Sequence, residues 1–313
     1  KVLSEKKYQY HSYIRSLYTN LTSQHLAQHP TDIMIWPETA MPFGLDQHFH
    51  HNYEQKSLLH SIQNWGVPII TGGYSQDARK KDHLGSPLIR NAIFYFSPNL
   101  NFSDQPYFKT NLLVFGEYMP MGEQFPFLYK LLPFVGVYEK GSGPIVAKVT
   151  YKETSKDKET SKETSKDQQK ERTLNMGPQV CYDSLYPSFS RGLAQNGAQI
   201  LFNVTNDAWY GWWSEPFQHQ MMTLARGIEV RRPLIRSTNT GFSSAILADG
   251  TLLQNSPLDQ SWTYTYSIPY IEKPDQSFYT KLGYLDWIVW TLLLGLLIII
   301  YKKREPHVLT KRC

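Results

Sequence analysis

The sequence predicts a mixed α/β domain in which helices cover the faces of β-sheets, followed by one apolar C-terminal helix. Short apolar runs that stop at proline, glycine or serine alternate with longer amphipathic segments early in the chain, and hairpin patterns follow later. This alternation is typical of strands and helices packed in layers. At 313 residues the chain can bury a substantial core, as one large domain or two small ones.

The expected elements follow from the spacing of apolar residues and from the turn residues between them. In the first third we expect a helix over 1–29, a strand over 32–36 that stops at Pro37-Glu38, a helix over 52–64, a strand over 67–71 broken by Gly72-Gly73, and a strand over 91–96. Further along we expect a helix over 187–196, a strand over 200–204, a helix over 214–230 and a hairpin over 234–247 that turns at Asn239-Thr240-Gly241.

One segment carries no folding signal. Residues 152–170 are near-copies of Glu-Thr-Ser-Lys and contain no aromatic or aliphatic side chain. Such a stretch cannot bury enough apolar surface to offset the entropy lost on ordering. We therefore expect a disordered, low-complexity insertion over 151–172.

The C-terminal helix predicts contact with a membrane. From Trp287 to Tyr301 the chain is apolar on every face, whereas a helix on a soluble domain shows a polar stripe. These fifteen residues cover roughly 22 Å, less than the ~30 Å hydrocarbon core, so a buried or interfacial helix is the alternative. We predict a transmembrane helix over 284–301 and a basic cytoplasmic tail over 302–313, because lysine and arginine crowd that end. The domain over 1–283 then lies on the extracytoplasmic side.

Composition excludes other classes of protein. The net charge of +5 is mild, and there is no dense basic stripe with interleaved aromatics, so nucleic acid is not an expected partner. The ten histidines show no metal-ligand spacing; His48, His50 and His51 cluster without a carboxylate pattern and are expected at the surface. We predict neither a metal nor a cofactor.

Cys181 is one of two cysteines and ends the strand-like run Gly-Pro-Gln-Val-Cys. Cys313 would lie across the membrane and could not pair with it. A free thiol in an oxidising compartment risks oxidation, so its retention suggests a function.

Three further residues could support thiol chemistry, which needs a base and a cation nearby. Glu38 follows a buried strand in the run Trp-Pro-Glu-Thr-Ala, and Lys109 and Glu117 share the run Lys-Thr-Asn-Leu-Leu-Val-Phe-Gly-Glu-Tyr. Taken singly, each has an ordinary explanation as a surface carboxylate, a solvated lysine or, for the cysteine, a small core residue.

Taken together, WPETA, KxxLxxFGEY and CYD in this order resemble the catalytic regions of the nitrilase superfamily, and more narrowly the apolipoprotein N-acyltransferase family. Lys109 and Glu117 have that family's spacing of eight, and Asn206-Asp207-Ala208-Trp209 matches its Asn-Asp-Ala-Trp element. The resemblance covers roughly residues 10–301. The residues that resemble the family's closing helix and hairpin are Gln218, His219, Arg226, Glu229, Arg232, Pro233, Arg236, Thr238, Asn239 and Gly241.

Two positions depart from the family pattern. Asp183 stands where the family usually has Glu, one methylene longer, and Val114 stands where a proline is expected. If the carboxylate at 183 only orients its neighbours, the shorter side chain is a mild change. If it must reach a substrate amine, activity would suffer.

The resemblance implies a nitrilase-like four-layer α-β-β-α sandwich over 1–283 with a Glu-Lys-Cys triad. Cys181 would be the nucleophile, Glu38 the general base and Lys109 the cation that stabilises thiolate and oxyanion. The remaining implied residues are Glu117, Tyr182 and Asp183 as supporting groups, and Asn206 and Trp209 in the substrate pocket.

The implied reaction moves an acyl chain from a phospholipid, through a Cys181 thioester, to the N-terminal amine of a diacylglyceryl-cysteine apolipoprotein. The expected setting is a monomer in the bacterial inner membrane, with apolar loops at 125–127 and 131–135 either dipping towards lipid or packing in the core. Two alternatives remain open: a nitrilase-like amidohydrolase acting on a small amide, and a membrane-anchored binding module whose triad is vestigial.

Overall fold

Two β-sheets packed face to face form the centre of the computed structural model, which describes residues 2–45, 53–82, 84–99, 105–153, 170–209 and 214–304. The first sheet has the order β1-β3-β4-β5, with β2 also paired to β3, and the second has the order β10-β9-β8-β7-β6. The first sheet comprises β1 (Met34–Ile35), β2 (Met41–Gly44), β3 (Ile69–Lys81), β4 (Pro87–Phe96) and β5 (Tyr107–Phe108). The second comprises β6 (Ala147–Lys152), β7 (Glu171–Val180), β8 (Ile200–Thr205), β9 (Leu234–Thr238) and β10 (Ser244–Ile246).

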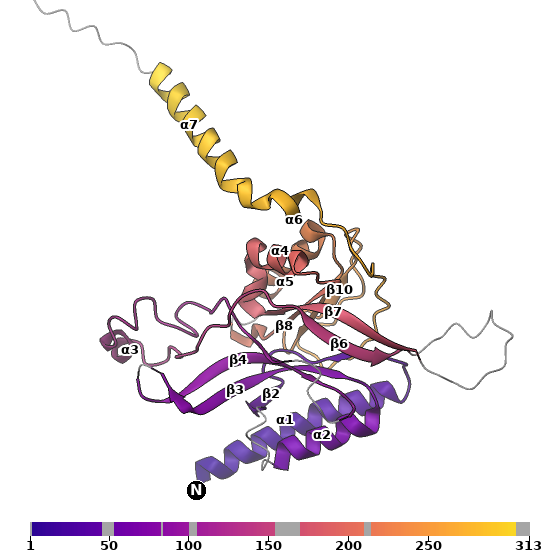
Figure 1. Cartoon of the computed structure of the whole chain (residues 1–313). Helices are drawn as coiled ribbons and strands as arrows, with labels where there is room; N and C mark the ends of the chain where they lie inside the picture. Colours follow the sequence, from indigo (N-terminus) through magenta and orange to yellow (C-terminus); the bar gives the residue numbers. More distant parts are fainter. Residues whose placement is uncertain are drawn as a thin grey trace, which may run out of the picture.

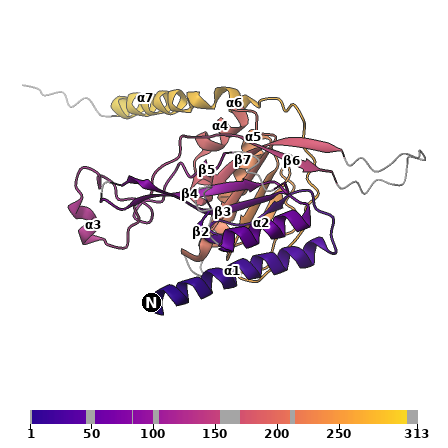
Figure 2. The same ribbon diagram turned by 60° about the horizontal axis from the view of Figure 1, so that its bottom comes forward.

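Helices cover the outer face of each sheet, as Figures 1 and 2 show. α1 (Val2–Leu26) and α2 (Tyr53–Trp65) lie on the first sheet, and α4 (Pro187–Gln195) and α5 (Glu215–Val230) lie on the second. This confirms the predicted nitrilase-like α/β fold with two sheets between helical layers.

Two apolar clusters hold these layers together. Between the sheets, Ile70 and Tyr95 of the first pack with Met176 and Phe202 of the second. Between the first sheet and its helices lies a separate cluster that includes Trp36, Leu58, Ile62, Phe94 and Phe96. Each fully buried side chain of this kind contributes about 1.5–3 kcal/mol to folding.

Strand direction explains where polar groups gather. β7, β8 and β9 are parallel, with Val180 paired to Val204 and Thr205 paired to Thr238. Every residue of β8 is buried, as expected for a central parallel strand covered on both faces. The carboxyl ends of these strands therefore meet at one edge, where such sheets place their sites.

The expected break at Gly72-Gly73 is wrong, because β3 runs through both glycines to Lys81. A Cβ at Gly72 would stand 2.7 Å from the Pro37 carbonyl oxygen and 2.6 Å from Glu38 Cα. Glycine is needed here so that β3 can pass close to the turn that carries Glu38, not to end the strand. The strand expected over 32–36 is also shorter, Met34–Ile35.

The hairpin of β6 and β7 borders the low-complexity segment. Tyr151 pairs with Arg172 and Lys152 with Glu171, so both ends of the expected 151–172 insertion are strand. Residues 154–169 lie outside the described part of the chain, and their predicted disorder stays a prediction.

The apolar loop after β5 packs apart from the two main clusters, around a small buried cluster of its own that includes Met119, Tyr129 and Val135. It carries the short helix α3 (Phe127–Leu131), and Phe127, Leu131 and Phe134 are 56%, 68% and 73% exposed, although Val135 is buried. Figure 1 shows this arm extending from the side of the sandwich.

The C-terminal helix begins after α6 (Phe278–Leu282) and runs as α7 over Asp286–Arg304. It projects away from the two sheets in Figure 1, and its leucines and the isoleucines at 298–300 are exposed. Among the residues described, no helix combines the length and the apolarity needed to cross a membrane. Most of the basic tail, from residue 305, lies outside the described residues.

Candidate active site

Glu38 lies in the turn after β1, where it is only 4% exposed. Its neighbour Thr39 has a φ of 52°, a left-handed conformation that turns the chain sharply behind the carboxylate. The side-chain amide of Asn91, on β4, donates to Glu38 Oε1 at 2.6 Å. The second oxygen, Oε2, is buried and has no hydrogen-bond partner within the described residues. One oxygen is thus fixed and the other is open to a proton.

Lys109 follows β5 and is 2% exposed. Its Nζ lies 2.8 Å from Glu117 Oε2 and 3.6 Å from Glu38 Oε1. Glu117 also accepts hydrogen bonds from Asn91 Nδ2 at 3.0 Å and from the Leu113 backbone N–H at 2.8 Å. A buried ammonium between two carboxylates satisfies the rule that buried charges must be paired.

Cys181 follows the last residue of β7 and begins a short 3₁₀ helix over Cys181–Leu185. Its φ of 45° is unusual for a residue with a side chain. Such a backbone conformation costs of order 1–3 kcal/mol, which contacts with the surrounding residues must offset. Asn203 donates to the Cys181 carbonyl at 3.4 Å, and the Ser184 hydroxyl donates to the same oxygen at 2.9 Å. The sharp turn therefore sets the thiol at the carboxyl edge of the second sheet.

Burial dominates the electrostatics of the three residues. It raises the pKa of the Cys181 thiol to about 12; the nearby Glu38 carboxylate raises it further, and Lys109 opposes both. Burial also raises the pKa of Glu38, against the opposing effect of Lys109. Burial lowers the pKa of Lys109, but Glu38, Cys181 and Glu117 outweigh it, so this pKa is raised. The resting thiol is consequently protonated at neutral pH. The raised pKa of the nearby Glu38 carboxylate makes that group a stronger proton acceptor than an ordinary Glu.

Asp183 is completely buried and ties the loop after Lys109 to the cysteine turn. Its Oδ1 accepts the backbone N–H of Asn111 at 2.7 Å and of Thr110 at 3.2 Å. Its Oδ2 accepts the Tyr107 hydroxyl at 2.7 Å and the Val180 N–H at 3.0 Å. Both carboxylate oxygens are thus occupied by neighbouring donors, as expected if this side chain orients its surroundings.

The structure places the remaining predicted residues at the same edge. Tyr182, next to Cys181, is half-buried, with its ring 5.6 Å from that of Tyr186. The backbone amide of Asn206 favours the charged form of Glu38, while its side chain accepts the Ala208 N–H at 3.1 Å. The side chain of Trp209, like residues 210–213, lies outside the described part.

Asn91 was missed by the sequence reasoning, although it contacts both Glu38 and Glu117. So was Thr205, whose buried hydroxyl lowers the pKa of Cys181. The sequence signal that could have found them is a polar side chain within or at the end of an otherwise apolar strand, because polar side chains are seldom fully buried without a role there.

A second polar cluster was also missed. Asp207, Glu215 and His219 offer ligand atoms within 4.8 Å of one another and are the residues that could hold a metal ion in the described part of the chain. The three histidines His48, His50 and His51 lie outside it.

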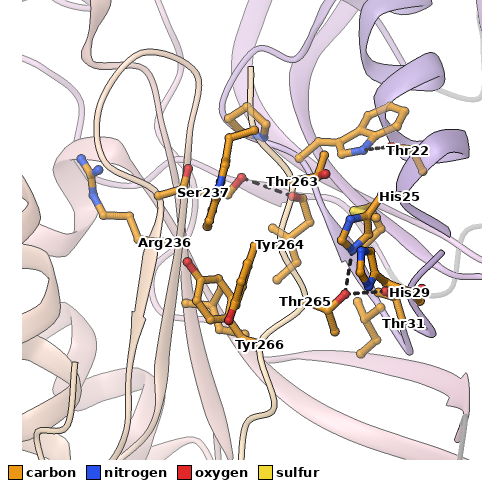
Figure 3. A pocket seen from close by; sticks show the side chains of 18 of the residues that line it. Thr22, His25, His29, Thr31, Arg236, Ser237, Thr263, Tyr264, Thr265 and Tyr266 are labelled. Carbon is orange, nitrogen blue, oxygen red and sulfur yellow. Dashed lines mark hydrogen bonds between the residues drawn. The ribbon is translucent and has the colours of Figure 1, made fainter. Parts of the chain in front are cut away.

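A large cavity of about 1060 Å³ lies apart from the triad, between α1, the inner face of the second sheet and the segment 259–270. Figure 3 shows His25 and Thr31 in its wall, both hydrogen-bonded to Thr265. Glu38, Lys109 and Cys181 do not line it.

Comparisons with known proteins agree with this arrangement. Residues 11–270 match the carbon–nitrogen hydrolase family. An apolipoprotein N-acyltransferase of Bdellovibrio bacteriovorus is 45% identical over 299 residues, which cover 95% of this chain and 51% of that protein. One of Geobacter metallireducens is 29% identical over 298 residues, covering 93% and 50%. The chain spans about half the length of these curated relatives.

Solved structures share the fold at low identity. A crystal structure of a carbon–nitrogen hydrolase from Helicobacter pylori G27 has a TM-score of 0.53 at 18% identity, covering 80% of this chain and 82% of that one. An amidase from Nesterenkonia sp. has a TM-score of 0.50 at 15% identity, covering 79% and 81%.

Proposed function

The chain belongs to the carbon–nitrogen hydrolase family, and from this we propose that it transfers an acyl chain from a phospholipid to the N-terminal amine of a diacylglyceryl-cysteine apolipoprotein. One observation carries the proposal. Glu38, Lys109 and Cys181 converge as a buried set in a chain that is 45% identical, over 95% of its length, to an apolipoprotein N-acyltransferase.

The first half-reaction needs a base at the moment of attack, because a thiol with a pKa of about 12 is protonated at neutral pH. Glu38, through its open Oε2, takes the Cys181 proton as sulfur bonds to the ester carbonyl carbon. The bond from that carbon to the glycerol oxygen then breaks. The leaving oxygen takes the proton from Glu38, which gives a lysophospholipid and a thioacyl-enzyme. A placed acid–base group of this kind contributes about 10²–10⁴-fold.

Lys109 supplies the positive charge for the oxyanion of the tetrahedral intermediate, and the Tyr182 backbone N–H is the second proposed donor. Each such donor stabilises a transition state by roughly 3–4 kcal/mol. Glu117 holds the Lys109 ammonium, with 2.8 Å between Nζ and Oε2. Asp183 holds the loop that follows Lys109.

In the second half-reaction the acceptor amine attacks the thioester carbonyl. Glu38 takes a proton from the amine nitrogen, the carbon–sulfur bond breaks, and Cys181 recovers its proton. The product is an amide, which is stable against the reverse attack of the thiol. Asn206 and Trp209 are proposed to shape the pocket in which the acceptor sits.

Both proposed substrates reside in a membrane, and two exposed apolar elements suit contact with it. One is α7, with Trp287 and Trp290 exposed near its start; the other is the α3 arm with Phe127 and Phe134. Amphipathic aromatic rings favour the membrane interface. The span over 284–301, the bacterial inner membrane, the extracytoplasmic side for the catalytic domain and the monomeric state are parts of this proposal.

The test follows the acyl chain in the intact protein, reconstituted in phospholipid vesicles. With a fluorescent phospholipid we expect label on the protein through a bond that neutral hydroxylamine cleaves, and transfer of that label to an apolipoprotein peptide. Cys181→Ala, which lacks the thiol, is the negative control. No label on the wild type, or equal label on Cys181→Ala, would overturn the proposal. Turnover of a small amide without lipid would identify an amidohydrolase instead.

A further inference from the structure

A closed cluster of charged side chains anchors the turn that follows β8. We call Asp207, His219 and Arg236 the Asp207 cluster; they are only 1%, 4% and 1% exposed. Asp207 Oδ1 lies 2.9 Å from His219 Nδ1, and Oδ2 accepts from Arg236 Nη2 at 2.8 Å. Arg236 is itself fixed, since its Nη1 donates to the Phe242 carbonyl at 2.7 Å.

The cluster joins three elements. Asp207 follows β8, His219 is on α5 and Arg236 is on β9. The β9–β10 turn also packs on the carboxylate, because a Cβ at Gly241 would collide with Asp207 Oδ2. The turn after β8 is thus held from the helix, from the neighbouring strand and from the next turn.

The anchored turn carries two groups that act on the catalytic residues. The end of β8 lies beside the cysteine turn, since Val204 pairs with Val180 and Asn203 donates to the Cys181 carbonyl at 3.4 Å. The Thr205 hydroxyl is buried without a hydrogen-bond partner among the described residues and lies near enough to favour the thiolate of Cys181. The backbone amide of Asn206 stabilises the carboxylate of Glu38. Asp207 comes next in the chain, and its own side chain is fully engaged with His219 and Arg236.

We propose that Asp207 is a positioning residue for the reaction: through its cluster it holds the end of β8 and the turn after it beside the cysteine turn, with Thr205 near Cys181 and Asn206 near Glu38. It touches neither substrate nor sulfur and acts only through the turn. The inference rests on the proposed function of the triad, and the experiment below includes a readout that does not need lipid.

The same atoms could instead hold a metal ion together with Glu215. Two observations favour the hydrogen-bonded cluster. The Arg236 guanidinium already contacts the Asp207 carboxylate, so a dication would sit beside a fixed positive charge. His219 Nε2 is buried without a partner in the described residues, whereas a metal-bound histidine is usually oriented through its other ring nitrogen.

The experiment uses Asp207→Asn in the intact protein, in a background where Cys313 and any cysteine outside residues 1–313 are replaced by Ser, so that Cys181 is the only thiol. Asn keeps the shape but leaves the buried Arg236 without its counter-ion. We expect thioester formation to slow roughly 10- to 100-fold, part of the effect of a placed acid–base group. Alkylation of Cys181 by iodoacetamide should also slow, and its pH midpoint should rise, because the displaced Thr205 hydroxyl no longer favours the thiolate.

A second pair of variants, at His219, tests the same role if Asp207→Asn does not fold. His219→Asn keeps a donor near the position of Nδ1, whereas His219→Ala removes it. We expect His219→Asn to alkylate close to the wild-type rate and His219→Ala to be slow with a raised midpoint. Asp249→Asn is the matched control, because Asp249 caps an exposed turn through the Thr251 N–H at 2.9 Å.

The outcomes separate the claims. A folded Asp207→Asn protein with the wild-type alkylation rate and midpoint, or a His219→Asn protein as slow as His219→Ala, would overturn the positioning role. Loss of wild-type alkylation in EDTA, restored by Mn²⁺ or Zn²⁺, would identify a metal site and also overturn it. Absence of lipid label on the wild type, with the alkylation changes as expected, would reject the proposed function and leave the positioning role standing.

Discussion

Asn91 Nδ2 lies 2.6 Å from Glu38 Oε1, so a strand amide fixes one oxygen of the proposed base and leaves the other free. The same nitrogen is 3.0 Å from Glu117 Oε1. One neutral side chain thereby spaces the buried carboxylate of Glu38 and the partly buried carboxylate of Glu117 around Lys109. Since both carboxylates accept a hydrogen bond from the same Asn91 amide, its loss should affect Glu38 and Lys109 together.

Replacing Asn91 by Ala should raise the pKa of Glu38 further, because the charged form loses a donor. The acid limb of the pH profile for thioester formation should move to higher pH, and the rate at pH 7 should fall about tenfold. Asn196→Ala is the control, an exposed amide that bonds the Pro144 carbonyl. An unmoved acid limb in Asn91→Ala would contradict this role.

Removing the cation should separate stability from catalysis. Lys109→Met leaves two carboxylates unpaired in the interior and should lower the free energy of unfolding by about 3–5 kcal/mol. Adding Glu117→Gln should restore part of that stability without restoring acylation. Denaturant unfolding and lipid labelling measure the two effects. Recovery of acylation in the double variant would show that Lys109 is only structural.

The two oxygens of Asp183 have different partners, which Asp183→Asn can distinguish from Asp183→Ala. An Asn keeps an acceptor for Thr110 and Asn111 but turns an NH₂ towards the Val180 N–H, at a cost of about 1–3 kcal/mol. We expect Asp183→Asn to retain measurable acylation and Asp183→Ala to lose far more, since its loop is released. Equal losses would mean that the carboxylate charge itself is needed.

Gly72→Ala should displace the backbone of the turn that carries Glu38. The added Cβ would overlap the Pro37 carbonyl and Glu38 Cα, so the turn must shift. We expect a loss of about 1–3 kcal/mol of stability, typical of overpacking, together with slower acylation. Gly295→Ala, where a Cβ meets nothing within 4 Å, should change neither; normal acylation in Gly72→Ala would contradict the prediction.

The Cys181 thiol should make stability depend on pH in alkaline solution. Its pKa is about 12 in the folded protein against an ordinary value of 9.0, so folding favours the protonated form. The contribution is complete below pH 9 and is lost as the pH rises towards 12, by roughly 2 kcal/mol at pH 10.5. Thermal unfolding of wild type and Cys181→Ala should therefore converge or cross between these pH values. If the melting temperatures of the two proteins depend on pH in the same way, the thiol is not desolvated in the folded state.

Local patterns were enough for much of the fold. The helices over 52–64 and 187–196 and the hairpin over 234–247 lie within a few residues of α2, α4 and the β9–β10 pair. These elements depend on periodicity and turn residues near in the chain. The Gly72-Gly73 break was wrong because pairing with β4 and contact with a distant turn outweighed the local preference of glycine.

The sequence by itself determined the order and identity of the reactive groups: a carboxylate after the first strand, a lysine with a second carboxylate eight residues on, and a cysteine at a strand end. Only the tertiary structure decided that Glu38 and Lys109 meet at 3.6 Å, that Asn91 joins them and that Asp207 anchors the turn beside them. The physical reason is that these contacts join residues from different strands and from both sheets. Their distances depend on sheet pairing and sandwich packing, which no local run of residues specifies.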